Sequence, residues 1–506
     1  MRLTFMAGTA AAVLFAGVEL LPGVAHAQPG GVSSACSIDP NTPKELALQT
    51  LAMSRVGLAQ SPEEANKILQ GVLKELDTKP KRFEKNSTGY NYVLSQVLSA
   101  YIAGMNTGPT PTRGSLGFVT NPDQPYDLVE NLDATFKAIV ASAPECASDV
   151  ETMRQNEAWL ALTKAALDAS NVAQLDSAEY YARRAMVLST ANPYPEYVLA
   201  NVANARDDKK GAIAHWQKVV ELAGSDTTYS DLHDGSLYYI AMTQYELASS
   251  LSGAQQVAEA KDAAGSLKAL FLANMDSPDA VSMLQAWSES LRMAGDTANI
   301  QQVYADLLQN PERASDLTFT MAGVIATQIN RGEDALKLFE LAAQKNPYNR
   351  DAQRNIAVTY HGRDMFQEMI EPTRKLVELD PNNYDAWMMF AYSAQGLGKE
   401  ATDAKVRQAW TDSLIKYQNF ADSLPVKVEV MNFTRGSKTA SVSLSLEQMA
   451  SSVGNYSVTA EFLDAAGNVV ASGTESSGAI PTGERKTVTI NVSGEKIVGF
   501  RYKPLK

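Results

Sequence analysis

Histidine is the side chain most often used in acid–base catalysis and metal binding, so this chain's histidines are its first candidates for chemistry. They are far apart in the sequence, and no H-E-x-x-H, paired CxxC or EF-hand spacing places metal ligands together. His233 has acidic neighbours, but we interpret Asp234 as the cap of the helix that follows it. We therefore predict no metal, no cofactor and no catalytic residue. The four histidines are His26, His215, His233 and His361.

Two other segments match catalytic motifs only in part. Ser413 and Lys416 fit the S-x-x-K pattern of penicillin-binding enzymes, but no S-D-N or K-T-G follows them. Gly396-Leu-Gly398-Lys399 resembles the end of a phosphate-binding P-loop, but Glu400 follows the lysine where that motif needs Ser or Thr. We interpret this segment as a turn between two helices. The sequence thus predicts a protein that is not an enzyme.

The N-terminus has the features of an export signal. After Met1-Arg2, residues 3–21 are mostly apolar, and Ala25-His26-Ala27 fits an A-x-A cleavage site. We expect residues 1–27 to be a signal peptide, with a retained membrane anchor as the alternative. The signal peptide indicates an exported protein, periplasmic or extracellular, with no transmembrane segment after cleavage.

The chain has two cysteines, Cys36 and Cys146. Export makes a disulfide between them plausible, because disulfides form and persist in oxidising compartments. Such a bond would tie the start of the mature chain to the end of the first helical region, residues 28–149. Two unpaired thiols are the alternative.

The charge balance excludes some partners. The formal net charge is −13 at pH 7, whereas nucleic acid and anionic lipid surfaces require a basic footprint. From residue 425 to the end, 9 Lys and Arg stand against 7 Asp and Glu, so the acidity belongs to the rest of the chain. We expect a protein or peptide partner and no nucleic acid.

A glycine- and proline-rich segment, residues 104–125, interrupts the N-terminal helical region. Glycine and proline at this density prevent a regular helix. Long loops of this kind are either binding loops or flexible insertions, and we favour the flexible interpretation here. A hidden catalytic site is a third possibility, but the segment offers Ser, Thr and Arg113 without a base.

From residue 150 to residue 423 the chain repeats itself. Pro347 and Pro381 are 34 residues apart and close similar segments, Asn-Pro-Tyr-Asn and Asp-Pro-Asn-Asn. A period of about 34 with two helical patterns per unit is typical of helix–turn–helix repeats. Small residues recur at the same step, where neighbouring helices must approach closely: Ala166 and Ala200, Ala178 and Ala212, and Gly323, Ala357 and Ala391.

These repeats resemble the tetratricopeptide repeat (TPR) family, in which a Leu–small–Tyr pattern in the first helix precedes Ala–aromatic–Ala in the second, with a closing Pro. The departures are Gln353 at the usual bulky position, Thr373 at the usual aromatic position, and Pro372, which we expect to bend its helix. The matching residues are Gly323, Ala335, Phe339, Ala342 and Pro347; Ile356, Ala357, Tyr360, Phe366, Met369, Leu376 and Pro381; and Trp387, Phe390, Ala391 and Gly398.

The resemblance implies an α-solenoid whose concave surface binds a partner, because stacked repeats leave an extended groove. In this family positions two, five, nine and twelve of each first helix face the groove. The alternative is that the groove is only solvated surface. The residues so placed are Tyr197, Asn201 and Asn204; Thr320, Val324 and Thr327; Arg354, Val358 and His361; and Met388, Tyr392 and Gln395.

At residue 424 the pattern changes to alternating apolar and polar residues with frequent turn signals, which predicts an antiparallel β-sandwich over residues 424–506. This part resembles the small immunoglobulin-like domains named for a Phe-x-Leu-Tyr-Asp motif. The likeness rests on Phe462, Leu463, Asp464 and Gly467, with Pro481, Gly483 and Glu484 in a later turn.

We thus expect a mainly α protein: a TPR-like solenoid followed by a small sandwich. The function that this combination favours is an exported, non-enzymatic scaffold that presents its groove to a protein or peptide in a bacterial envelope. The alternative is a cell-wall or carbohydrate-associated protein that uses the sandwich as its contact module.

Overall fold

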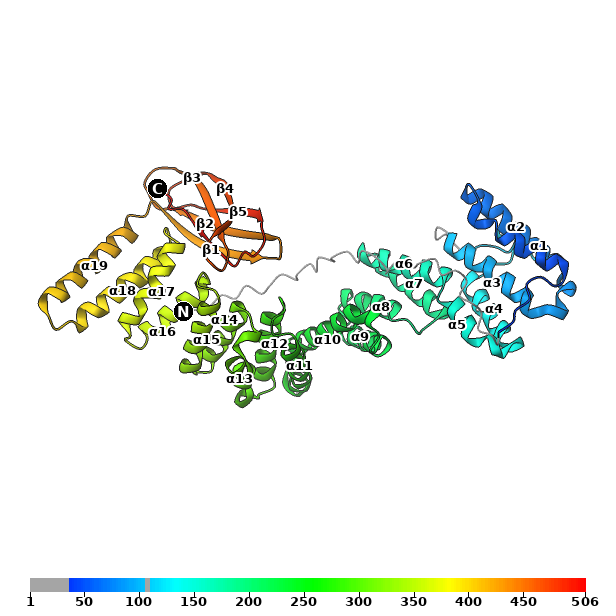
Figure 1. The fold of residues 1–506 in the computed structure, drawn as a ribbon, viewed down its shortest axis with the longest axis horizontal. Helices are drawn as coiled ribbons and strands as arrows, with labels where there is room; N and C mark the ends of the chain where they lie inside the picture. Colours follow the sequence, from blue (N-terminus) through cyan, green and yellow to red (C-terminus); the bar gives the residue numbers. More distant parts are fainter. Residues whose placement is uncertain (1–35, 105–109) are drawn as a thin grey trace. The chain divides into compact units, whose positions relative to one another are not determined.

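A computed structural model of the chain describes residues 36–104 and 110–506 (Figure 1). The signal peptide expected at residues 1–27 lies outside this range. Contacts within the chain divide it into two units, residues 1–243 and 244–506. Each unit is described by itself.

The first unit is built from helices α1 to α9, and α10 (Ser230–Ser250) spans the division. Helices pack in sequential pairs, α6 with α7 and α8 with α9. The bounds are α1 (Lys44–Met53), α2 (Pro62–Thr78), α3 (Ser87–Gly104), α4 (Leu128–Ser142), α5 (Ala147–Arg154), α6 (Glu157–Asn171), α7 (Leu175–Leu188), α8 (Tyr194–Ala205) and α9 (Lys209–Ala223).

Helix α2 shows how local sequence sets these elements. Ser61 caps it by accepting a hydrogen bond from the backbone N–H of Glu64 at 3.2 Å, and Pro62 occupies the first turn, where its missing N–H costs nothing. Its apolar residues recur every three or four positions and point into one core shared by α1 to α7: Leu69, Val72, Leu73 and Leu76.

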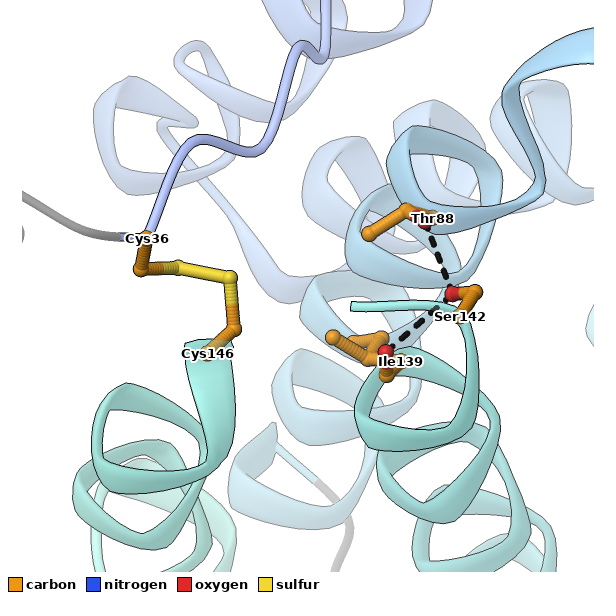
Figure 2. Close-up of a disulfide and its surroundings, with 5 residues drawn as sticks. All are labelled: Cys36, Thr88, Ile139, Ser142 and Cys146. Atoms are coloured by element: carbon orange, nitrogen blue, oxygen red, sulfur yellow. Dashed lines mark hydrogen bonds between the residues drawn. A yellow bond between two sulfur atoms is a disulfide. The ribbon is translucent and has the colours of Figure 1, made fainter. Parts of the chain in front are cut away.

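Cys36 and Cys146 form the expected disulfide, with an S–S distance of 2.07 Å (Figure 2). Both residues are buried in the same core. Nearby, the hydroxyls of Thr88 on α3 and Ser142 on α4 lie 2.7 Å apart in a hydrogen bond. The disulfide closes a loop with a sequence separation of 110 and so fixes the start of the described chain to the region after α4.

The segment expected to be flexible is ordered over residues 110–125. The Arg113 guanidinium pairs with the Asp77 carboxylate at 2.9 Å and stacks on the Phe118 ring, 4.2 Å from its centroid. The backbone N–H groups of Val119 and Thr120 donate to the same carboxylate at 2.8 and 2.7 Å. The flexible interpretation was therefore wrong for this part, because a carboxylate more than thirty residues earlier organises the loop.

Removing the disulfide tests its contribution. We expect the double variant Cys36→Ser, Cys146→Ser to lose about 2–5 kcal/mol of unfolding free energy in the first unit, because the unfolded chain regains the entropy of a long open loop. Hydrogen exchange of α1 to α4 would report this loss, and the helices of residues 316–379 in the second unit serve as the internal control. Unchanged protection of α3 and α4 would contradict the prediction.

The second unit continues the helical pairs. Two inter-repeat turns are built alike: Asn349 caps α16 through the N–H of Ala352 at 3.0 Å, and Asn383 caps α18 through the N–H of Ala386 at 2.9 Å. The bounds are α11 (Gly253–Ala273), α12 (Ala280–Met293), α13 (Gln302–Gln309), α14 (Asp316–Gln328), α15 (Gly332–Lys345), α16 (Arg350–His361), α17 (Phe366–Leu379), α18 (Tyr384–Glu400) and α19 (Ala404–Asp422).

Small residues allow these helices to approach closely. A Cβ added at Gly323 of α14 would lie 2.4 Å from the Phe339 ring of α15, and one at Gly396 of α18 would lie 2.1 Å from the Phe366 ring of α17. A larger residue at either position would force the two helices apart.

Two local predictions were wrong. Gly396-Leu-Gly398-Lys399 is the last part of α18 and not a turn, because its glycines serve helix packing. Asp234 does not begin a helix: it lies inside α10 with His233, whose Nδ1 is 2.8 Å from the Asp234 carboxylate. Helix α17 runs through Pro372 without interruption.

The C-terminal part has two three-stranded antiparallel sheets, in the orders β1-β2-β5 and β4-β3-β6. Alternate apolar side chains from both sheets meet in one core, including Val442, Leu444, Phe462 and Phe500. The bounds are β1 (Val426–Arg435), β2 (Thr439–Gln448), β3 (Gly454–Leu463), β4 (Val469–Ile480), β5 (Arg485–Ser493) and β6 (Gly499–Tyr502).

The turn between β3 and β4 shows the structural role of the residues on which the resemblance to immunoglobulin-like domains rests. Asp464 accepts hydrogen bonds from the N–H groups of Ala466 and Asn468, both at 2.9 Å, and Gly467 has φ of +86°, a conformation that favours glycine. Phe462 is fully buried in the sandwich core. In the part of the chain that the structure describes, no helix has the length and apolarity needed to cross a bilayer.

Candidate functional site

The groove residues predicted in the second unit lie on the first helix of three successive pairs, α14, α16 and α18. Each helix contributes positions five, nine and twelve counted from its first residue. The exposed members are Thr327, Arg354, Val358, His361, Tyr392 and Gln395, and the half-buried members are Val324 and Met388.

Thr320 is not available to a partner. It is only 9% exposed, and its hydroxyl donates to the Asp316 backbone carbonyl at 2.8 Å while accepting from the Asn349 side chain at 3.1 Å. Its role is to hold the turn before α16.

Aromatic and apolar side chains of two repeats meet in the centre of this face. The His361 ring on α16 lies 5.9 Å from the Tyr392 ring on α18 and 6.0 Å from the Phe366 ring on α17. Val358 is 54% exposed and Tyr392 is 41% exposed. An apolar residue left this open beside an aromatic one is the kind of surface on which a partner's side chains can be buried.

The remaining predicted groove residues, Tyr197, Asn201 and Asn204, lie on α8 in the first unit. Tyr197 is half-buried against the cluster around Trp216, and Asn204 is exposed. On the same helix, the Glu196 carboxylate is 2.6 Å from Nδ1 of His215 on α9. The other nine predicted groove residues belong to the second unit.

The candidate residues for chemistry are spread over several helices. Among residues 36–104 and 110–506, no group of three His, Cys, Asp or Glu side chains is placed to hold a metal. Ser413, from the S-x-x-K match, donates its hydroxyl to the Ala409 carbonyl within α19 at 2.9 Å. Burial, together with a hydrogen bond to Glu340, raises the pKa of the Tyr360 hydroxyl to about 12, so this tyrosine stays neutral at physiological pH.

The second unit also contains a polar junction between the solenoid and the sandwich, and it is centred on Asn382. The side-chain amide of Asn382 pairs with the backbone of Leu505 in both directions, at 2.8 and 2.9 Å. Its backbone carbonyl accepts the N–H of Val428 on β1 at 3.0 Å. Asn382 is 1% exposed, so it satisfies edge groups of the sandwich that would otherwise be buried without partners.

An ion pair supports this junction. Arg350 contacts both carboxylate oxygens of Asp380 at 2.9 Å, donates to the Phe500 carbonyl at 2.7 Å, and stacks on the Phe500 ring at 3.7 Å. Burial raises the pKa of Asp380 above its ordinary value, and Arg350 opposes this shift. Burial also raises the pKa of Tyr502, whose hydroxyl accepts the N–H of Asn382 at 3.2 Å.

A second polar cluster joins the preceding turn to the sandwich. The Asp316 carboxylate receives the side-chain N–H groups of Asn346 and Asn349 at 2.8 and 3.0 Å and pairs with Arg435 on β1. Asn346 and Arg435 also donate to the Val498 carbonyl at 2.9 and 2.6 Å. Sandwich and solenoid are therefore held together by side chains from two successive turns.

Sequence reasoning did not find this junction. Its signal was present, because Asn346 and Asn349 belong to the same Asn-Pro-Tyr-Asn turn, and Asn382 belongs to the Asp-Pro-Asn-Asn turn. Both segments were interpreted only as markers of the repeat period. The asparagines that gather in both turns are the signal that would have suggested a buried polar contact.

The comparisons found no matching family model and no matching curated protein. Among solved structures, the MamA protein is 13% identical, with 45% of this chain and 89% of that chain covered and a TM-score of 0.23. YrrB, a TPR protein with an unusual peptide-binding site, is 16% identical, with 47% and 95% covered and a TM-score of 0.23. A TPR protein from Parabacteroides merdae is 13% identical, with 53% and 99% covered and a TM-score of 0.29.

The class of the protein follows from its own helix pairs and strands. It is a TPR-type α-solenoid that ends in a small antiparallel β-sandwich. Stacked repeats of this kind leave an extended concave surface.

Replacing Asn382 tests the junction. Asn382→Ala should weaken sandwich attachment by at least about 2 kcal/mol, because the N–H and carbonyl of Leu505 lose their partners while buried. Hydrogen exchange of β1 and of residues 499–506 should quicken. Asn432→Ala, at an exposed position on β1, is the matched control. Equal protection of β1 in both variants and wild type would show that Asn382 is dispensable.

Proposed function

We propose that this protein is an exported, non-enzymatic scaffold that binds an extended segment of a protein partner on the groove of α14, α16 and α18. The observation that carries the proposal is the contact of His361 with Tyr392, with an open Val358 about one turn earlier on α16. These side chains come from adjacent repeats, so a peptide lying across both would bury all three at once.

Export is the second part of the proposal. The Cys36–Cys146 disulfide supports it, because such bonds persist in oxidising compartments. The signal-peptide pattern of residues 1–27 supports it from the sequence. We further propose that the sandwich belongs to the small immunoglobulin-like domains of envelope proteins. The support is the Asp464 turn, which uses the motif residues for a defined structural purpose.

A photo-crosslinking amino acid placed singly at positions 358 and 392 tests the groove in the native envelope. We expect both positions to crosslink to the same partner, because they lie on neighbouring helices of one surface. Positions 180 and 406 are the controls, since Tyr180 on α7 and Val406 on α19 are similarly exposed, at 56% and 48%, but lie outside the groove. Equal crosslinking from all four positions would refute a specific groove.

The identified partner then allows a quantitative test. Tyr392→Ala should weaken binding about tenfold or more, because truncating a central aromatic contact costs about 2 kcal/mol or more. Tyr180→Ala should leave the Kd unchanged, and thermal unfolding should show that both variants remain folded. A Kd that is insensitive to Tyr392→Ala would rule out this face as the binding surface.

A further inference from the structure

A polar cavity of about 160 Å³ lies where the solenoid meets the sandwich in the second unit. One wall is the first turn of α18, with Asn383, Tyr384 and Asp385. The other wall is formed by neighbouring positions on the outer face of β1, β2 and β5. A cavity of this size can receive the end of one long side chain.

The two walls are fixed to each other. The Asn383 side chain donates to the Val428 carbonyl at 3.3 Å, and the Val428 N–H donates to the Asn382 carbonyl at 3.0 Å. Because Val428 itself lines the cavity, these bonds set the width of the opening. The cavity is therefore preformed, and a ligand would not have to order it.

The charged side chains that line the cavity are only partly paired with opposite charges. Arg485 lies 2.7 Å from Glu447 and 3.8 Å from Glu429, and the Lys427 ammonium lies 4.1 Å from the centroid of the Tyr384 ring. Asp385 has no ion-pair or hydrogen-bond partner for its carboxylate within the described ranges. Three carboxylates thus face two cations, which leaves a formal charge of −1.

A hydroxyl in the cavity wall points to the same conclusion. Ser445 lines the cavity and is only 9% exposed. Its side chain makes no hydrogen bond to any residue that the structure describes. Because it has no such partner, this hydroxyl is available as an acceptor for a ligand's N–H.

The cavity also continues the groove. Asp385 is the second residue of α18 and lies three residues before Met388, so the two side chains are neighbours on one side of the helix. A peptide lying over Met388 and Tyr392 would reach Asp385 about one helical turn further along. The cavity therefore adjoins the groove residues of α18, and one chain can occupy both.

We propose that this cavity takes the side chain of a lysine or arginine in the peptide partner, pairing it with Asp385 and Glu429 and with the Ser445 hydroxyl. The inference rests on the proposed function, since it names the chemistry of the same partner. The local charge of −1 and the net charge of −13 on the chain both favour a basic segment.

The test uses the full chain and blocked single amino acids, so that only the side chain differs. N-acetyl-arginine amide and N-acetyl-lysine amide are titrated against N-acetyl-glutamine amide and N-acetyl-glutamate amide, with binding followed by saturation-transfer NMR. We expect the basic amides to bind about tenfold more tightly than the neutral one, since a charge-assisted contact is worth that factor. Equal binding of the neutral or acidic amide would overturn the proposal.

Matched variants locate the binding. Asp385→Asn should weaken the basic amides about tenfold, whereas Asp351→Asn, the same position on α16 and also exposed, should have no effect. If Asp385→Asn unfolds α18, the exposed Glu429→Gln decides instead, with a severalfold loss expected. Unchanged binding in the folded variants would overturn the proposal.

The two proposals fail separately. If positions 358 and 392 crosslink to one partner but Asp385→Asn does not weaken binding of the basic amides, the groove proposal stands and the cavity proposal fails. If basic amides bind at Asp385 but the groove positions do not crosslink specifically, the cavity proposal stands and the groove proposal fails.

Discussion

The structure of the second unit depends on how the backbone N–H and carbonyl groups at the open edges of a small sandwich find hydrogen-bond partners. A six-stranded sandwich has edge strands whose N–H and carbonyl groups need partners once they are covered. Here Asn382 supplies both a donor and an acceptor to Leu505 and a backbone acceptor to Val428. Without these bonds, covering the edge would leave polar groups buried and unpaired, at a cost of about 1–3 kcal/mol each.

The repeat itself provides this solution. The turn that ends one helix pair and caps the next occurs twice in succession, at Asn346–Asn349 and at Asp380–Asn383. Asn349 and Asn383 serve as helix caps, and their neighbours Asn346 and Asn382 reach the sandwich. One sequence pattern therefore both caps a helix and contacts the sandwich. From the sequence, only its regular spacing in the repeat could be recognised.

This arrangement has a consequence for recognition. Because the sandwich is attached at the first turns of α16 and α18, strand residues lie beside the residues that begin the groove helices. The groove proposed on α14, α16 and α18 uses side chains at positions five, nine and twelve of each helix. In the proposed binding mode, the sandwich adds charged residues at one end of this groove, so the charge of the partner there also matters.

The sequence by itself determined the fold class and the helix pairs, because the 34-residue period, the small residues at Gly323, Ala357 and Ala391, and the alternating pattern after residue 424 are local signals. It also placed Val358, His361 and Tyr392 on one face through the repeat register. Only the tertiary structure decided what depends on distant contacts. Asp77 orders the Arg113 loop, Asn349 removes Thr320 from the groove, and Asn382 joins turns to strands more than forty residues away. Such hydrogen bonds leave no periodic trace, since each needs two residues that meet only after the repeats have stacked.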